Sequence, residues 1–434
     1  MSDPGGPSVR DGGAGAGAWP PPGGGTSASG RASTVGGLGP ATAGGRAAGA
    51  GEAAVGGEQP PPGSEEPPAD GGPPTAVGVL RAMGLRPLAL LGQGMEGTVY
   101  RLADGLVGKV WSNGRTAAEA RRFAAFHAEL AAQRLPFATP EPVAVRERDG
   151  LVVTVERELP GVPLSEAGLG PAAGHAAVVE VVTALRTTTA GPAARALPAL
   201  GEAAPLWAGH SSWPEALAAL VERRATAGRT AFARALSGAT ARPGANGGGP
   251  DAGPVADAGV GAATGPVAGA GAGAGAGSDP GADAGGDWRA GQDAVLAGVL
   301  ARLRALPTSD GPARVVHGDI CPPNILVDND GRVVGLLDWG FLSTAGDNAF
   351  DAATAAGFFD MYGPEARGHD EALLVTMTGQ LGYPRETLLT YRAAYALATA
   401  TVYSSAGDDG HFAWCVNFLQ RPEVRELLGL GMTH

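Results

Sequence analysis

Apolar residues follow a strand-like pattern in the first periodic part of the chain. It begins near Val77 with VGVLRAMGLRPLALLGQGMEGTVYRL, in which LALLGQG and GTVYRL form two short β-type runs around a glycine turn. The runs GLVGKVW and LVVTVEREL indicate two further strands, whereas TAAEARRFAAFHAEL between them has helical spacing. Residues 77–157 are therefore predicted to form a small β-rich lobe with one helix.

A larger block of helical periodicity follows Pro160, Gly161 and Pro163, which predict a hinge. Most of residues 158–434 is Ala- and Leu-rich, and DAVLAGVLARLRAL is typical of a helix with one buried face. Before the C-terminal helical sequence, ILV, the turn DNDG and VVGLL predict a β-hairpin. A β-rich N-lobe and a larger α-rich C-lobe give an α+β fold class. The predicted helical face consists of Val295, Leu296, Val299, Leu300 and Leu303.

Two stretches of the 434-residue chain show neither the alternation of a strand nor the spacing of a helix. The chain contains 73 Gly and 36 Pro, and many of them lie in residues 1–76 and in residues 242–287, which include GPVAGAGAGAGAGSDPGADAGGD. Such sequence buries too little apolar surface to offset the entropy lost on ordering. We therefore predict a disordered tail over residues 1–76 and a flexible insertion over residues 242–287, within the C-lobe.

Charge and cysteine content narrow the class of protein. The formal net charge is -12, which argues against a nucleic-acid surface, although the two low-complexity stretches carry much of it. Only two cysteines occur, Cys321 and Cys415, and no apolar run has the length of a signal sequence or a membrane span. We expect a cytoplasmic protein whose partners are neither nucleic acid nor membrane.

The glycine turn has the spacing GxGxxG, formed by Gly92, Gly94 and Gly97. In a dinucleotide-binding fold this motif opens a helix. Here the β-forming residues 98–100 follow, so the glycines are predicted at the tip of a hairpin that could bring backbone N–H groups over phosphates. An ordinary glycine turn explains the motif equally well.

Lys109 lies in an otherwise apolar strand, where a lysine is unusual unless its ammonium meets an anion. In the helix that follows, Glu119 shares its stripe with Phe123 and later apolar residues, so we predict that Glu119 pairs with Lys109. Alternatively, Lys109 is solvated, and Glu119 is a helix N-terminal residue favoured by the macrodipole. Glu129 is a substitute partner for the lysine.

The octapeptide HGDICPPN, residues 317–324, contains two prolines that forbid a helix within it. The predicted hairpin brings the side chains of Asn324 and Asp338 close together, because neighbouring strands are about 4.8 Å apart. Their oxygen atoms can then bind one hard, oxygen-preferring cation. Asp319 lies outside this pair. It can accept or orient the proton of an attacking hydroxyl.

The register of the hairpin decides how close these groups come. If Val327 faces Arg332 across the turn, Asn324 faces Gly335, and Asp338 lies three residues beyond that pair. The hairpin is then expected to hold Asp338 beside the loop.

The order of these features resembles the aminoglycoside phosphotransferase family, within the wider protein-kinase-like fold. A glycine hairpin, a strand lysine, a helical glutamate, HGDxxxxN and the aspartate of LLDWG occur in that order from about Val77 to the C-terminus, apart from the insertion. The resemblance implies two kinase-like lobes, with the nucleotide bound by the N-lobe. It implies transfer of phosphate from ATP, with GTP as an alternative donor, to a small-molecule hydroxyl in the presence of Mg²⁺.

By this resemblance Asp319 is expected to be the catalytic base, with Asn324 and Asp338 as the magnesium ligands. Lys109, positioned by Glu119, would contact the nucleotide phosphates. The lid over the phosphates would be formed by Gly92, Gly94 and Gly97. His317 would order the catalytic loop, and Asp351 would stabilise it by hydrogen bonds.

Departures from the protein-kinase pattern favour a small acceptor over a polypeptide. HGD replaces HRD and DWG replaces DFG. The residues between Asp338 and the tripeptide GPE at 363–365 include few Ser or Thr and no basic cluster that would bind a phosphorylated loop. The alternative function is a catalytically weak or inactive nucleotide-binding module with a regulatory role.

Carboxylates that could bind a cationic acceptor occur near the C-terminus at Asp360, Asp408 and Asp409, although helix caps and solvated loops explain them as well. The mild acidity of the periodic part favours a small hydroxyl compound over a polycation such as an aminoglycoside. His411 and Cys415, four residues apart, are too few for a metal site and predict core packing.

Overall fold

The computed structural model describes residues 75–94, 96–111, 114–238, 286–307 and 311–431. The predicted tail (1–76) and the predicted insertion (242–287) lie outside these ranges, apart from the last two residues of each.

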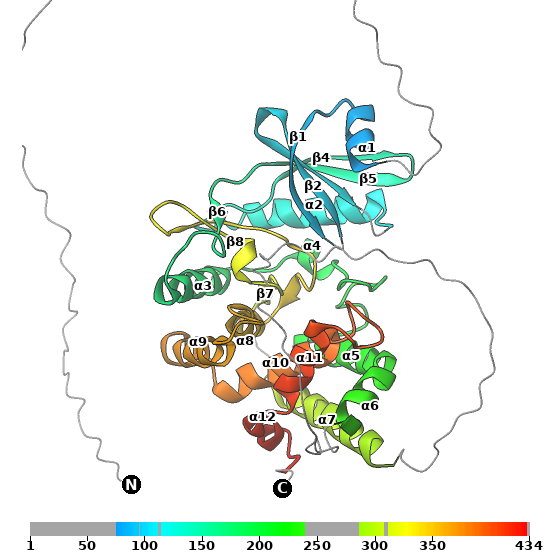
Figure 1. Cartoon of the computed structure of the whole chain (residues 1–434), viewed down its shortest axis with the longest axis vertical. Helices are drawn as coiled ribbons and strands as arrows, with labels where there is room; N and C mark the ends of the chain where they lie inside the picture. The colour runs from blue at the N-terminus through cyan, green and yellow to red at the C-terminus, as the bar shows by residue number, and fades with distance from the viewer. Residues whose placement is uncertain (1–74, 95, 112–113, 239–285, 308–310, 432–434) are drawn as a thin grey trace, which may run out of the picture. The chain divides into compact units, whose positions relative to one another are not determined.

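A five-stranded antiparallel sheet forms the first part of the described chain (Figure 1), with the strand order β1-β2-β3-β5-β4. Each of the four predicted β-type runs contributes a strand, and β4 is an additional one. The strands are β1 (Pro87–Gly94), β2 (Gly97–Leu102), β3 (Leu106–Trp111), β4 (Pro142–Arg148) and β5 (Leu151–Arg157).

Two helices pack against this sheet, α1 (Ala76–Ala82) and α2 (Ala117–Ala131). The apolar side chains of α1 pack with Val110 and Val153, whereas those of α2 pack with Trp111 and Val152. Successive residues of a strand point to opposite faces, so the two helices cover opposite sides of the sheet.

The second part of the described chain contains five short strands and most of the helices. Strands β6, β8 and β9 form one small antiparallel sheet, and β7 pairs with β10. The predicted hairpin is confirmed as β8 and β9. The strands are β6 (Val162–Pro163), β7 (Arg314–Val316), β8 (Ile325–Val327), β9 (Val333–Leu336) and β10 (Thr344–Gly346).

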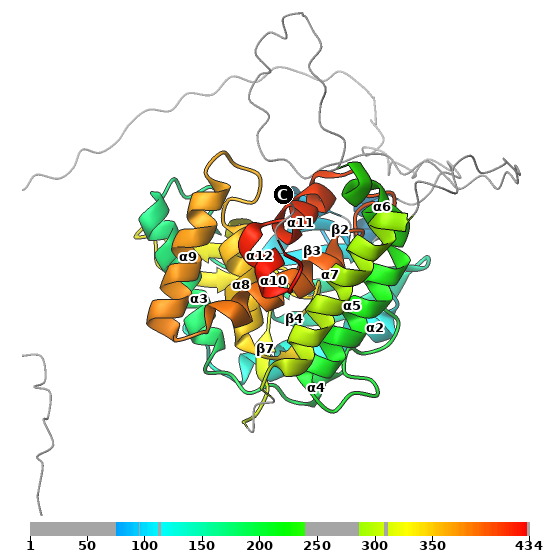
Figure 2. The same ribbon diagram turned by 90° about the horizontal axis from the view of Figure 1, so that it is seen from below.

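Helix α10 is the centre of the helical part, since it contacts α5, α7, α8 and α11 and almost all of its residues are buried. Figure 2 shows α5, α6 and α7 beside one another along one edge of the C-lobe. The helices are α3 (Pro171–Leu185), α4 (Pro192–Arg195), α5 (Trp213–Ala227), α6 (Arg229–Gly238), α7 (Gly286–Ala305), α8 (Asn348–Phe358), α9 (Ala366–Leu381), α10 (Arg385–Thr399), α11 (Gly410–Leu419) and α12 (Pro422–Leu427).

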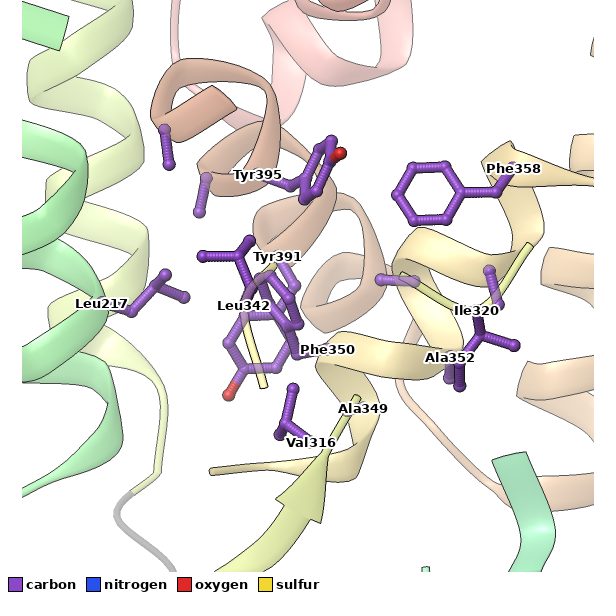
Figure 3. Packing of buried hydrophobic residues seen from close by; sticks show 14 of the residues in the cluster. Leu217, Val316, Ile320, Leu342, Ala349, Phe350, Ala352, Phe358, Tyr391 and Tyr395 are labelled. Atoms are coloured by element: carbon purple, nitrogen blue, oxygen red, sulfur yellow. The ribbon is translucent and has the colours of Figure 1, made fainter. Parts of the chain in front are cut away.

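The core of the C-lobe joins these helices to the strands on either side of the loop that carries HGDICPPN. Figure 3 shows Phe350 of α8 beside Tyr391 of α10. Val316, the last residue of β7, and Ile320, within HGDICPPN, belong to the same cluster. The predicted apolar face of α7 is part of this core, and four of its five residues are buried. The loop is thus supported from below by packed apolar side chains.

The α+β fold class, with a small β-rich N-lobe and a larger α-rich C-lobe, is confirmed. In the part of the chain that the structure describes, no helix has the length and apolar character needed to cross a membrane.

Candidate active site

The loop between β7 and β8 carries the motif HGDICPPN. It turns sharply at Gly318, which has φ of +83°. A Cβ atom there would lie 2.6 Å from Cβ of Leu342, so only glycine fits this position. The tight turn places Asp319 directly after the end of β7.

His317 anchors the loop through both ring nitrogens. Its Nε2 lies 2.9 Å from the backbone oxygen of Leu337, and its Nδ1 accepts the N–H of Asp319 at 3.1 Å. Burial lowers the pKa of His317 to about 4, so the ring is neutral and Nε2 carries the donated proton. The ring also packs against Trp339, with centroids 4.4 Å apart. The predicted loop-ordering role of His317 is confirmed.

Asp351 of α8 binds the backbone of the same loop by hydrogen bonds. Its carboxylate accepts the N–H groups of His317 at 2.9 Å and of Gly318 at 2.8 Å, as predicted. The side chain is fully buried, and burial raises its pKa to about 7 while the two hydrogen bonds oppose that rise. The loop geometry therefore depends on a residue 34 positions away from His317.

Asp319 is half-buried at the surface of the loop and is held by Asn324. The Asn324 Nδ2 donates to Oδ2 of Asp319 at 3.1 Å and to its backbone oxygen at 2.9 Å. Burial, and then the negative charge of Asp338, raise the pKa of Asp319 to about 7, against the effect of the Asn324 hydrogen bond. A carboxylate with a pKa in this range can exchange a proton near neutral pH.

The predicted register of the β8–β9 hairpin is wrong by two residues at its open end. Leu326 pairs with Gly335, and the N–H of Leu337 donates to the oxygen of Asn324 at 2.8 Å. An irregularity between Leu326 and Val327 shifts the register inside the hairpin. Because Asn324 lies opposite Leu337, Asp338 is the next residue along and comes closer to Asn324 than predicted.

The side chains of Asn324 and Asp338 form a donor set that suits a hard cation. Asn324 uses its Nδ2 for Asp319, which leaves its oxygen to point elsewhere, and the Asp338 side chain is 55% exposed. Asp338 has φ of +56°, a left-handed backbone conformation that is uncommon for a residue other than glycine. Mg²⁺ commonly takes only one or two protein oxygens together with phosphates and water. Within the described ranges no group of three or more His, Cys, Asp or Glu could hold a metal ion.

Lys109 of β3 reaches the C-lobe residues directly. Its Nζ lies 2.8 Å from Oε2 of Glu96 and 3.5 Å from Oδ1 of Asp338, 229 residues further along the chain. Burial works against the charged form, but the carboxylates of Asp338 and Glu96 raise the pKa of Lys109, so the ammonium is retained. The contact brings together two of the predicted site residues.

The predicted pair between Lys109 and Glu119 does not form. Glu119 instead closes a capping box at the start of α2, where its Oε2 accepts the N–H of Thr116 at 2.7 Å and its own N–H donates to the Thr116 hydroxyl. The alternative assignment, a helix N-terminal residue, therefore describes Glu119. The other candidate, Glu129, accepts the N–H of Gly191 at 2.7 Å and of Ala193 at 2.9 Å at the start of α4.

Sequence reasoning missed the residue that does meet the lysine, Glu96, and a second cation, Arg115. Oε1 of Glu96 lies 3.2 Å from Nη2 of Arg115. The available signal was the position of Glu96 inside the glycine turn. Glu96 lies three residues before Val99, and Val99 pairs with Lys109 in the β2–β3 register. The apolar stripe that includes Glu119 describes only one face of one helix.

The three glycines of the turn lie at the end of the β1–β2 hairpin, as predicted, with Gly94 opposite Gly97. Gly97 has φ of +156°, and a Cβ atom there would collide with the backbone oxygen of Val110. Gly92 and Gly94 have open space around the position of a Cβ. The hairpin is thus packed against β3 at Gly97, whereas a Cβ at Gly92 or Gly94 would meet no neighbouring atom.

The geometry of the loop agrees with a comparison to known families. Residues 274–388 match the family model APH, described as the phosphotransferase enzyme family. The chain is therefore similar to this phosphotransferase family over these residues. The matched residues include His317–Asn324, Asp338 and Asp351, so the predicted resemblance is confirmed over this segment.

Other similarities are limited in extent or in identity. A segment of 29 residues is 59% identical to the uncharacterized protein YcbJ of Bacillus subtilis (strain 168), and it spans 7% of this chain and 10% of that protein. An aminoglycoside phosphotransferase, APH(3'')-Id from Streptomyces rimosus in complex with ADP and streptomycin, is 16% identical, with a TM-score of 0.40, and the match covers 74% of this chain and 96% of that one. Macrolide 2'-phosphotransferase type I is 17% identical, with a TM-score of 0.43 and coverage of 79% and 96%.

The acidic residues considered for acceptor binding have local partners in the structure. Asp409 caps α11 by accepting the N–H of Phe412 at 2.7 Å, and Asp408 accepts the hydroxyl of Ser404. Asp360 lies against the backbone of Gly363. These contacts match the alternative of helix caps and loop residues.

Tyr403 and Phe341 form an aromatic pair in the C-lobe. Tyr403 is 51% exposed and stacks on Phe341, with ring centroids 6.5 Å apart and an interplanar angle of 13°. Burial, followed by the charge of Asp319, raises the pKa of Tyr403 well above its usual range.

The buried pair His411 and Cys415 is a packing feature, with His411 Nε2 lying 3.1 Å from the hydroxyl of Thr399.

Proposed function

We propose that this protein is a small-molecule kinase that transfers the γ-phosphate of ATP to an alcohol group in the presence of Mg²⁺. The match of residues 274–388 to the phosphotransferase family model supports the reaction class. The observation that carries the proposal is the convergence of Asp319, Asn324, Asp338 and Lys109 from both lobes at one place. GTP is an alternative donor.

Asp319 is the proposed catalytic base. Its carboxylate takes the proton of the acceptor hydroxyl while the acceptor oxygen bonds to the γ-phosphorus and the bond to the bridging oxygen of the diphosphate breaks. The proton then leaves Asp319 for solvent. The hydrogen bond from Asn324 fixes the orientation of the carboxylate, and a pKa near 7 suits both uptake and release of the proton.

Asn324 and Asp338 are proposed to hold Mg²⁺ through their side-chain oxygens. When bound, the ion would neutralise charge on the phosphate oxygens. Lys109 provides a fixed positive charge beside Asp338 for the same phosphates. The backbone N–H groups of the hairpin containing Gly92, Gly94 and Gly97 are proposed to cover them. Glu119, which caps α2, has no part in this arrangement.

The proposed acceptor is a small hydroxyl compound and not a polycation. Recognition of several ammonium groups would need carboxylates that are available to them. Asp408 and Asp409 are engaged in local hydrogen bonds, whereas the ring of Tyr403 is exposed and offers an apolar face.

The proposal is tested with the purified full-length protein in two steps. Thermal shift with ATP or GTP, with and without Mg²⁺, measures nucleotide binding. An ADP-coupled assay against a panel of alcohols, with Asp319→Asn as the blank, then measures turnover. A shift with turnover on at least one alcohol is expected. Binding without turnover would favour the inactive regulatory module, and the absence of any shift would contradict both functions.

A further inference from the structure

A cluster of two cations bridged by one carboxylate lies beside the candidate active site. Glu96 holds Lys109 through Oε2 at 2.8 Å and Arg115 through Oε1 at 3.2 Å. Each oxygen of the carboxylate therefore serves a different cation. The Nζ atom of Lys109 also lies 3.5 Å from Oδ1 of Asp338, which places the bridge beside the proposed site.

The Arg115 guanidinium is held in place by aromatic rings. Its central carbon lies 4.0 Å from the ring centroid of Trp111 and 4.6 Å from that of Phe123, and its side chain is only 8% exposed. Trp111 is itself fixed, since its Nε1 donates to the hydroxyl of Thr154 at 3.2 Å. The ammonium of Lys109 lies 4.1 Å from the same Trp111 ring. The packing therefore positions both cations before any ligand binds.

This arrangement presents the contacts that a phosphate group takes. An arginine fork and a lysine ammonium bind an oxyanion from two sides, and a carboxylate and a phosphate are interchangeable partners for such donors. A phosphate brought to Lys109 would also approach Glu96, whose charge repels it. Glu96 and the phosphate therefore compete for the same two cations.

The hairpin that carries Glu96 allows the carboxylate to leave. Gly97 is pressed against the backbone of Val110, so the turn stays attached to β3. A Cβ placed at Gly94 or Gly92 meets no atom within 4 Å, so this side of the turn is not packed against the rest of the described chain. A change in the turn, or a rotation of Glu96, releases Lys109 and Arg115 without disturbing the sheet.

We propose, building on the proposed nucleotide-dependent function, that Arg115 is a second phosphate-binding cation and that Glu96 is its internal counterion, displaced by the nucleotide phosphates. Arg115 and Lys109 then hold the phosphates together, while Trp111 and Phe123 act as positioning residues for them.

Isothermal titration calorimetry on the full-length protein tests this with Mg-ATP, Mg-ADP and adenosine at fixed ionic strength. Arg115→Met keeps an unbranched side chain between the rings but removes the charge, and it should weaken ATP and ADP binding at least tenfold while changing adenosine binding less than twofold. Glu96→Gln removes the competing charge and should strengthen ATP binding at least threefold. Glu141→Gln makes the same charge change in an exposed ion pair with Arg157. It should alter neither ATP binding nor adenosine binding.

A double-mutant cycle separates competition from a general charge effect. If Glu96 acts by occupying Arg115, the gain from Glu96→Gln is reduced in the Arg115→Met background. Weaker ATP binding in Glu96→Gln would overturn the proposal and would indicate instead that Glu96 supports the site, for example as a metal ligand. An unchanged ATP affinity in Arg115→Met would also overturn it. If the wild-type protein bound no nucleotide, the proposed function itself would fail. If the wild-type protein bound ATP but Glu96→Gln weakened that binding, only this inference would be contradicted.

Discussion

The side-chain amide of Asn324 donates to the carboxylate of Asp319, with 3.1 Å between Nδ2 and Oδ2. The two residues are five positions apart, and the turn through two prolines brings them together. This bond orients the proposed base and turns the amide oxygen of Asn324 away from it. One residue thus connects the proposed proton acceptor with the proposed metal site.

Chemistry and nucleotide binding should separate at Asp319 and Asp338. We expect Asp319→Asn to lower turnover at least about 100-fold, because a positioned base contributes roughly that much, with Mg-ATP affinity changed only slightly. Asp338→Ala should instead weaken Mg-ATP binding, which calorimetry would measure directly. Wild-type turnover in Asp319→Asn, once an acceptor is found, would remove that residue from its proposed role.

Glu119 should matter for stability and not for nucleotide binding. Glu119→Ala removes the reciprocal cap with Thr116, so we expect a loss of about 1 kcal/mol in the free energy of unfolding. ATP affinity should match that of the wild type, whereas Lys109→Met should lower it. Urea denaturation and calorimetry on the same preparations would check both. A loss of ATP affinity in Glu119→Ala equal to that in Lys109→Met would indicate that the two residues act together.

Asp351 should be needed for the geometry of the catalytic loop. Asp351→Asn leaves one acceptor oxygen for two buried N–H groups, so we expect about 1–3 kcal/mol less stability and a lower turnover. Asp328→Asn is a matched control, because Asp328 accepts two backbone N–H groups at 2.9 Å in the exposed turn between β8 and β9. Equal effects of the two substitutions on turnover would argue against a specific role for Asp351.

Stability should fall as the solution is acidified, in part through His411. Burial lowers its pKa to about 4, although Asp409 and the hydrogen bond with Thr399 oppose this. The unfolded chain has the ordinary pKa of about 6.5 and binds the proton first, so the free energy of unfolding drops as pH falls from about 6.5 towards 4. For this one group the loss between pH 7 and pH 5 is about 2 kcal/mol.

His411→Gln provides the comparison for that pH dependence. Buried His317 and His127, whose pKa values are lowered to about 4 and about 3, affect both proteins equally. Urea denaturation followed by circular dichroism at pH 7 and pH 5 should therefore show a smaller loss in His411→Gln than in the wild type. Identical losses would mean that His411 is protonated in the folded protein at pH 5.

Local sequence was sufficient for much of the architecture and for the closeness of two residues in the loop that carries HGDICPPN. Alternating apolar runs predicted β1, β2, β3 and β5, and the glycine and aspartate turns predicted both hairpins, because these patterns depend on neighbouring residues. The spacing in HGDICPPN identified Asp319 and Asn324 as residues that lie close together, and prolines limit the conformations between them.

Tertiary structure alone decided which groups meet across longer distances. Lys109 pairs with Glu96 and not with Glu119, because the β2–β3 register brings the glycine turn over the lysine while Thr116 engages the helical glutamate. The irregularity in β8 moved Asp338 next to the residue opposite Asn324. A register change of one or two residues involves small differences in backbone hydrogen bonding that side-chain patterns do not encode, so only the assembled sheet determines it.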